Sequence, residues 1–189
     1  MDKIRGNAGF TLLELTVVVA IIVALAAVVI PMVGQAKRDG QVAEVLQLVD
    51  SLRTAVHRFY SDAGKAPQEF GDSTTATDHQ LASKQTAIKN WAGPYIDHPL
   101  TSGDSPYGGF VKVFSSLDTS IESGFYLAGG AKDATGVGSY VSFGDFPEDM
   151  AQLVDEALDK GMSGDWKKFG RVQWANDVMD IFLLDTDGQ

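Results

Sequence analysis

The first feature of the chain is a long apolar run near its N-terminus. No charged side chain interrupts residues 15–36, which are mostly Val, Ile, Ala and Leu. A helix needs about 20 such residues to cross the hydrocarbon core of a bilayer. The pattern therefore predicts a transmembrane helix, with a short leader carrying Lys3 and Arg5 before it and a single acid, Glu14, at its start.

After Pro31 the apolar positions thin out into one stripe, spaced alternately by three and four residues. The stripe consists of Val42, Val45, Val49, Leu52, Val56 and Phe59. This spacing places all six on one face of a helix, which must be buried against a folded domain. We expect one helix from Phe10 to Asp62, bent at Pro31 and ended by Gly64, with the first half in lipid.

The remaining residues, 65–189, are expected to form the domain that covers this stripe. Short apolar runs between glycine-rich turns predict strands at 110–114, 125–128, 140–143, 171–174 and 178–184. A short helix is expected over 78–91, with Leu81, Ile88 and Trp91 facing inward. A second helix is expected to start with Asp145 as its cap and to end at Gly161. Its buried face is predicted to consist of Met150, Leu153, Val154, Ala157 and Leu158. The predicted fold class is α+β, a long helix packed on a small antiparallel sheet.

The net charge and the composition bear on which kinds of partner the chain could bind. The formal net charge is −10, and an acidic surface argues against nucleic acid as the principal partner. The chain contains no cysteine, so it has no disulfide framework.

Glycines and histidines give no positive sign of a catalytic or nucleotide site. Gly129, Gly130, Gly136 and Gly138 are not followed by the Lys-Ser/Thr of a phosphate-binding loop, so a surface loop is the better interpretation. The three histidines, His57, His79 and His98, lie far apart in sequence. His57 falls on the polar side of the long helix, and the spacing supports neither a zinc site nor a catalytic triad. The tryptophans, at 91, 166 and 174, are expected to pack in the core or between subunits.

Acidic residues crowd the C-terminus, namely Asp177, Asp180, Asp185 and Asp187, and another acidic turn runs from Asp159 to Asp165. Calcium binds six to eight oxygens and often takes several carboxylates from one loop. Calcium therefore stays open as a ligand, although no cofactor is required by the sequence. A solvated acidic face is the favoured interpretation.

The residues around Glu14 carry a family resemblance. The run Gly9-Phe10-Thr11-Leu12-Leu13-Glu14 resembles the cleavage and methylation motif of type IV pilins and type II secretion pseudopilins. The resemblance implies that a prepilin peptidase cuts between Gly9 and Phe10 and methylates the new amine of Phe10. It also implies that Glu14 is the assembly residue and that Pro31 bends the helix. Loss of the leader would make the mature chain slightly more acidic.

The resemblance also implies an organisation for the chain. Residues 1–9 would be the leader, 10–36 the transmembrane and polymerisation helix, 37–64 the amphipathic half, and 65–189 the extracytoplasmic domain. The protein would sit in a bacterial inner membrane, with its N-terminus cytoplasmic and its domain periplasmic. Its partners would be the bilayer, the peptidase, an inner-membrane assembly platform and other copies of itself.

The resulting prediction is a structural subunit of a helical filament and not an enzyme. The absence of cysteine and the turn Gly93-Pro94-Tyr95 favour a type II secretion pseudopilin over a type IV pilus subunit. The tryptophan usual in a later turn of major pseudopilins is missing. A third class stays open, a membrane-tethered extracytoplasmic binding domain, although a monomeric anchor would gain nothing from Glu14.

Overall fold

The structure is a computed structural model, and it describes residues 10–119, 121–122, 124–127, 132, 134–160, 162 and 164–185. The predicted leader, with Gly9, lies outside the described residues. So do several positions singled out in the sequence, namely Ala128, Gly129, Gly130, Gly161 and Asp187. The chain divides into two compact units, Met1–Gly40 and Gln41–Gln189.

The described part of the first unit is the beginning of helix α1, which spans Leu12–Ala63. Its large apolar side chains between Phe10 and Val33 are all 51–90% exposed. Within the described residues, α1 is the one helix that is long and apolar enough to cross a membrane. Pro31 lies inside α1 without ending it, and the predicted bend at that residue stays a prediction.

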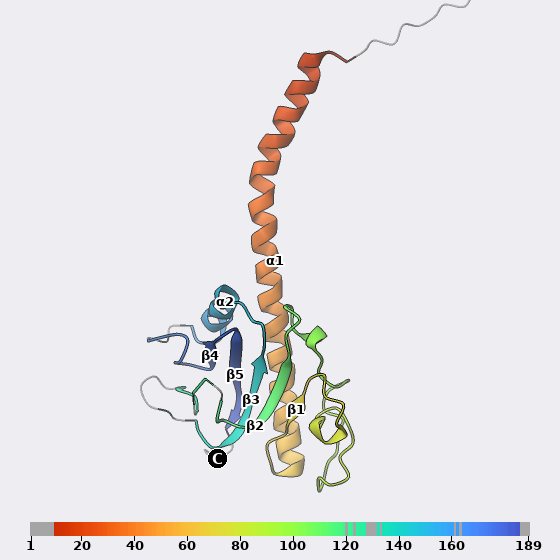
Figure 1. The fold of residues 1–189 in the computed structure, drawn as a ribbon, viewed down its shortest axis with the longest axis vertical. Coiled ribbons are helices and arrows are strands. Elements are labelled where there is room, and N and C mark those ends of the chain that lie inside the picture. Colours follow the sequence, from red (N-terminus) through yellow and green to blue (C-terminus); the bar gives the residue numbers. More distant parts are fainter. Residues whose placement is uncertain are drawn as a thin grey trace, which may run out of the picture. The chain divides into compact units, whose positions relative to one another are not determined.

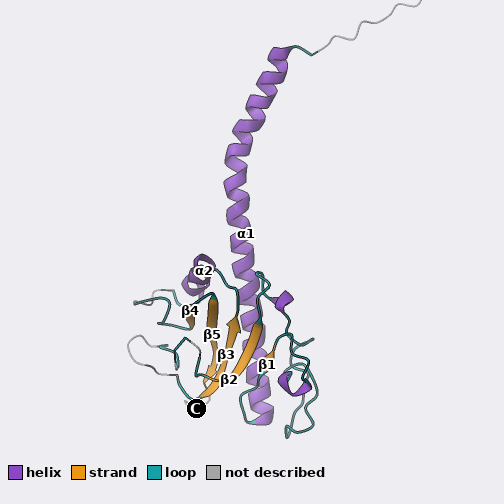
Figure 2. Cartoon of the chain, in the orientation of Figure 1, coloured by secondary structure: helices purple, strands orange, loops and turns teal. Residues whose placement is uncertain are grey.

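The second unit contains a five-stranded antiparallel sheet (Figures 1 and 2). The strands are β1 Glu69–Phe70, β2 Val111–Ser116, β3 Val137–Phe143, β4 Val172–Ala175 and β5 Val178–Asp185. They are ordered β1-β2-β3-β5-β4. Helix α2, Glu148–Leu158, precedes β4, and two 3-10 turns, Ala76–Asp78 and Ser102–Asp104, lie between β1 and β2. The predicted α+β fold class is confirmed.

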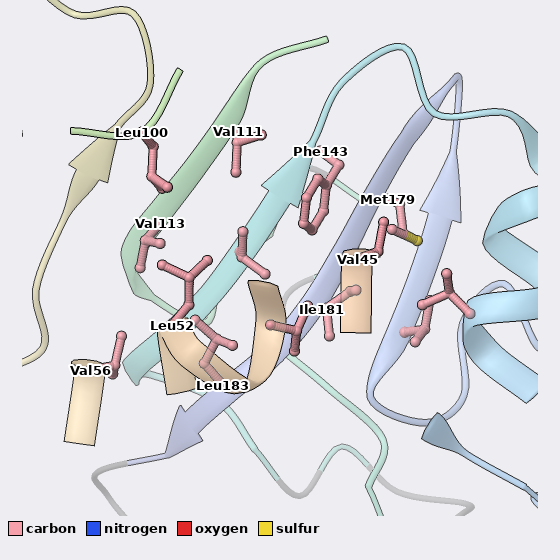
Figure 3. Packing of buried hydrophobic residues seen from close by; sticks show 14 of the residues in the cluster. Val45, Leu52, Val56, Leu100, Val111, Val113, Phe143, Met179, Ile181 and Leu183 are labelled. Carbon is pink, nitrogen blue, oxygen red and sulfur yellow. The ribbon is translucent and has the colours of Figure 1, made fainter. Parts of the chain in front are cut away.

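The main core lies between the second half of α1 and one face of the sheet. The fully buried residues of α1 are Val45, Val49, Leu52, Ala55, Val56 and Phe59. The predicted stripe is therefore confirmed, except that Val42 is only partly buried. Figure 3 shows Leu52 and Val56 of α1 within the same buried cluster as Val113 of β2. Removing such apolar side chains from water is the main stabilising term for this unit.

The opposite face of the sheet carries a smaller cluster, consisting of Leu117, Phe125, Ala134 and Tyr140. The expected strand at 125–128 is wrong in its described part. Phe125 and Tyr126 form only isolated bridges, to Ala134 and Gly170, and so cover the sheet instead of extending it. The other predicted strands are confirmed with shifted ends, and the two-residue strand β1 was not predicted.

The helix expected over 78–91 is wrong. Glu69 accepts hydrogen bonds from the backbone N–H groups of Leu81 and Ala82, at 2.9 and 3.3 Å. These donors are therefore not available to helical carbonyls four residues back. The inward side chains were correctly predicted, because Leu81 is fully buried and Ile88 and Trp91 pack on the main core.

Helix α2 begins later than expected. Its N-cap is Pro147, whereas the predicted cap, Asp145, lies in the left-handed region at φ 51°. The N–H of Phe146 donates to the carbonyl of Asp177. A residue distant in the sequence therefore holds the segment that leads into α2. On the buried face the prediction of Ala157 is wrong, since that residue is exposed and Asp155 is buried.

Candidate assembly site at the start of the first helix

The start of α1 is organised by Thr11 and Glu14. The Thr11 N–H donates to Glu14 Oε2 at 2.9 Å, and the Glu14 N–H donates to Thr11 Oγ1 at 3.2 Å. These reciprocal bonds form a capping box, which satisfies two backbone donors that the first turn of a helix leaves free. The Thr-x-x-Glu spacing is visible in the sequence, but we had not interpreted it as a cap.

The two oxygens of Glu14 are used differently. The Thr11 hydroxyl also donates to Oε2, at 2.9 Å, so this one carboxylate oxygen accepts two hydrogen bonds from Thr11. Among the described residues, none donates a hydrogen bond to Oε1, and Glu14 is exposed. The acid therefore has a local structural role and one oxygen left to accept a donor from elsewhere.

The charge of Glu14 has no cation close by in the sequence of the helix. From Phe10 onward, the first basic residues are Lys37 and Arg38. A carboxylate beside an apolar membrane segment is costly unless a partner neutralises it. Phe10, the predicted new N-terminus, lies four residues before Glu14 and is 90% exposed. Cleavage, methylation and the assembly role stay predictions.

The described residues of the domain also bear on the metal and acidic sites expected from the sequence. Within the described residues, no group of three or more His, Asp or Glu side chains could hold a metal ion. Asp185 is described but Asp187 is not, so the acidic C-terminal turn is only partly visible. Asp159, expected in an acidic turn, accepts the backbone N–H groups of Arg171 and Val172 at 2.6 and 3.1 Å.

The expectation of a solvated acidic face is wrong for Asp180. This residue lies on β5, directly opposite Ser142 of β3 and Gln173 of β4, and it is fully buried. Among the described residues, neither carboxylate oxygen of Asp180 has a hydrogen-bond partner. Burial raises the pKa of Asp180 to about 6, although the nearby hydroxyls of Ser142 and Thr119 act in the opposite direction.

A buried ion pair between Glu69 and His79 was also not predicted. Glu69 Oε1 lies 2.6 Å from His79 Nδ1, and the Ser73 carbonyl lies 2.8 Å from Nε2. With Glu69 as a carboxylate, both ring nitrogens face acceptors, and this arrangement favours a doubly protonated imidazole. Burial lowers the pKa of His79, but its bonds to Ser73 and Glu69 outweigh burial and raise the pKa overall. The pair closes the loop after β1.

The other singled-out side chains are structural. His57 is exposed, as predicted. Trp91, Trp166 and Trp174 are partly buried against the main core, which confirms their packing role.

The chain combines an exposed apolar helix, long enough to cross a membrane, with an α+β domain. The helix starts with a capping acid, Glu14. These features define the class of a folded domain carried on a candidate membrane helix. Comparison with curated proteins gives the family. A type IV major fimbrial protein FimA of Dichelobacter nodosus is 33% identical over 111 residues, which are 56% of this chain and 70% of the relative. The chain belongs to the type IV pilin family.

Two further relatives agree. A type IV major pilin protein PilE1 of Neisseria gonorrhoeae is 40% identical over 88 residues, 47% of this chain and 48% of the relative. A fimbrial protein of Neisseria meningitidis serogroup B is 34% identical over 76 residues, 40% of this chain and 45% of the relative. The chain thus spans about half the length of these two relatives. No family model and no solved structure matches the chain.

Proposed function

We propose that this protein is the structural subunit of a helical filament. It is made as a membrane-held precursor, cut between Gly9 and Phe10, methylated at the new amine and polymerised through α1. The observation that carries the proposal is the exposed acid Glu14, capped by Thr11, at the head of an exposed apolar helix. Membership in the pilin family supports it.

The chemistry of assembly follows from two charges. Cleavage places a cationic amine on Phe10, and methylation gives a secondary amine that keeps its charge. Glu14 Oε1 accepts a hydrogen bond from the amine of a neighbouring copy while Oε2 continues to cap the helix. Each charge is costly beside lipid, and pairing two of them between copies offsets that cost. The rest of the favourable free energy of assembly comes from packing the apolar side chains of residues 15–36 of neighbouring copies.

We place the filament among type IV pili, because the relatives are named as major pilins or fimbrial proteins. A type II secretion pseudopilin is the second candidate, supported by the absence of cysteine and by the turn Gly93-Pro94-Tyr95. In either case the work of the protein is polymerisation and not catalysis. A pilus subunit gives long fibres in the sheared surface fraction, whereas a secretion subunit is needed for release of an exported protein.

The proposed organisation is a leader at 1–9, a polymerisation helix at 10–36, an amphipathic half at 37–64 and an extracytoplasmic domain at 65–189. The proposed location is the inner membrane before assembly, with the N-terminus cytoplasmic. A prepilin peptidase and an assembly platform are the proposed membrane partners.

The test separates the charge of Glu14 from its role as a cap. Glu14→Gln keeps a side chain that can complete a capping box but removes the charge. Thr11→Ala removes the cap and keeps the charge. We expect Glu14→Gln to be inserted and cleaved normally but absent from the sheared filament fraction, and Thr11→Ala to assemble. Intact mass of the purified chain should give a mature protein starting at Phe10, heavier by one methyl group.

The opposite pattern would refute the mechanism. Filaments of Glu14→Gln together with loss of filaments in Thr11→Ala would mean that the acid is only a helix cap. A wild-type chain that retains Met1 and the rest of the leader would remove the processing step and the filament proposal with it.

A further inference from the structure

A groove runs along the domain between α1 and the segment before β2. It consists of two adjoining hollows of about 230 and 290 Å³, which share Leu48, Ser51 and Asp104 as lining residues. Leu48 and Ile96 are partly buried and contribute an apolar surface to the groove. The groove is therefore able to cover the aliphatic part of a side chain.

The polar lining of the groove is acidic. Glu44, Asp97 and Asp104 contribute carboxylates, and neither a lysine nor an arginine is among the residues that line the two hollows. Asp104 uses Oδ2 to hold Thr101, while its Oδ1 faces the ring of His98 at 3.9 Å. Glu44 and Asp97 are exposed. The groove thus combines an apolar wall with a rim of negative charge.

This combination fits a basic side chain. Lysine and arginine lay their methylene stems on apolar surface and keep the charged head in a polar environment. A stem on Leu48 and Ile96 would bring the head to the carboxylates of Glu44, Asp97 or Asp104. An acidic or purely apolar occupant would leave one part of the groove unmatched.

The most suitable donor of that side chain is another copy of the chain. Between Phe10 and Leu52, the only basic residues of α1 are Lys37 and Arg38, and both are exposed. Lys37 and Arg38 directly follow the apolar run of α1, whereas Arg53 and Arg58 lie further along the helix. In a filament that brings the apolar runs side by side, Lys37 and Arg38 are the first cations that a neighbouring copy meets. Because the chain carries a net charge of −10, contact between copies also needs a local opposite charge to offset repulsion.

We propose that the groove at Glu44, Asp97 and Asp104 receives Lys37 or Arg38 from α1 of a neighbouring copy. This inference rests on the proposed filament function and names the surface that fixes the register between subunits. It assigns the groove an occupant from the filament itself and not a small molecule.

Charge reversal tests the pairing. Lys37→Glu and Glu44→Lys should each lower the sheared filament fraction by about fivefold, as expected when an exposed pair becomes a repulsion. The double variant, Lys37→Glu with Glu44→Lys, should recover to the wild-type amount. Lys89→Glu is the matched control, because it removes an exposed lysine outside α1 and should leave assembly unchanged.

Cross-linking gives a second measurement that does not depend on the amount of filament. The natural chain lacks cysteine, so two differently tagged copies can carry Lys37→Cys and Asp97→Cys separately. Oxidation of mixed filaments should give a dimer that contains both tags, and filaments of either variant alone should give much less.

The outcomes separate this inference from the filament proposal. Normal filaments that give no mixed dimer overturn the groove pairing and leave the filament proposal intact. A double variant that assembles as poorly as the single reversals has the same meaning. Absence of filaments from the wild-type chain overturns the proposed function first.

Discussion

Replacing Asp180 by Asn should stabilise the domain at neutral pH. The carboxyl group is fully buried, and neither oxygen has a hydrogen-bond partner within the part of the chain that the structure describes. Burial raises its pKa from 3.8 to about 6. One pKa unit corresponds to about 1.4 kcal/mol, so ionising Asp180 in the folded state costs about 3 kcal/mol. Asparagine has nearly the same shape and cannot ionise.

The pH dependence has a defined sign. A carboxyl with a raised pKa binds its proton more tightly in the folded than in the unfolded state. Folding stability therefore falls as the pH rises from about 4 to about 6 and stays lower above that window. Asp180→Asn should remove this fall. We expect a gain of roughly 1 to 3 kcal/mol at pH 7.5 and little difference at pH 4, since the new amide also needs acceptors.

The assay is urea unfolding of the full-length protein in detergent, followed by tryptophan fluorescence. All three tryptophans, Trp91, Trp166 and Trp174, belong to the second unit, so the signal reports on the domain. Asp97→Asn is the control, because Asp97 is exposed and the change should have almost no effect. A loss of stability in Asp180→Asn at pH 7.5, or a gain that does not vary with pH, would refute the reasoning. Either result would mean that a bound cation or an ordered donor compensates the carboxylate.

Two further predictions concern the core and the loop after β1. Leu52→Ala should lower the free energy of unfolding in urea by about 2 to 5 kcal/mol, because the Leu52 side chain of α1 is fully buried in the main core. Gln47→Ala is the control, and it should change that free energy by less than about 0.5 kcal/mol because Gln47 is exposed. His79→Gln should lose about 1 to 3 kcal/mol near pH 6 and less at pH 9, because the raised pKa of His79 gives stability that is full below 6.5 and is lost as the pH rises through the folded pKa. An equal loss for His79→Gln at both pH values would contradict a charged His79–Glu69 pair.

The sequence predicted correctly the elements whose buried faces follow a regular spacing of apolar residues along the chain. The spacing of three and four residues from Val45 to Phe59 defines one helix face, and the whole face is buried. The run at 178–184 matches β5, and its apolar side chains from Met179 onward pack in one of the two clusters on the sheet. Such patterns depend on neighbours along the chain and need no knowledge of distant contacts.

The elements that were missed depend on single contacts between distant residues. Glu69 takes the backbone donors that a helix over 78–91 would have needed, from about a dozen residues away. Gln173 of β4 donates to the carbonyl of Gly124 at 2.8 Å and so holds the segment that we expected to be a strand. No periodicity marks these contacts, because each is made by one side chain.

The candidate site and the buried acid differ in the same way, since one depends on neighbours in the sequence and the other on distant residues. The Thr11–Glu14 cap is local, and the Thr-x-x-Glu spacing is its signal in the sequence, although the cap was not predicted. The burial of Asp180 depends on Ser142 and Gln173, which come from two other strands. A sequence-based view placed Asp180 in a solvated cluster because its neighbours in the chain are also acidic.

The distribution of charge along α1 explains why one helix would need two contact points in a filament. Residues 15–36 carry no charge, and apolar side chains pack without a strong preference for one axial position. Neighbouring helices could therefore slide along this part with little penalty. The charges at its two ends, Glu14 before it and Lys37 with Arg38 after it, are the features that can select one position. Changes at Glu14 should therefore prevent entry into the filament, while charge reversal at Lys37 or Glu44 should lower the amount of filament because the register between subunits is less well fixed.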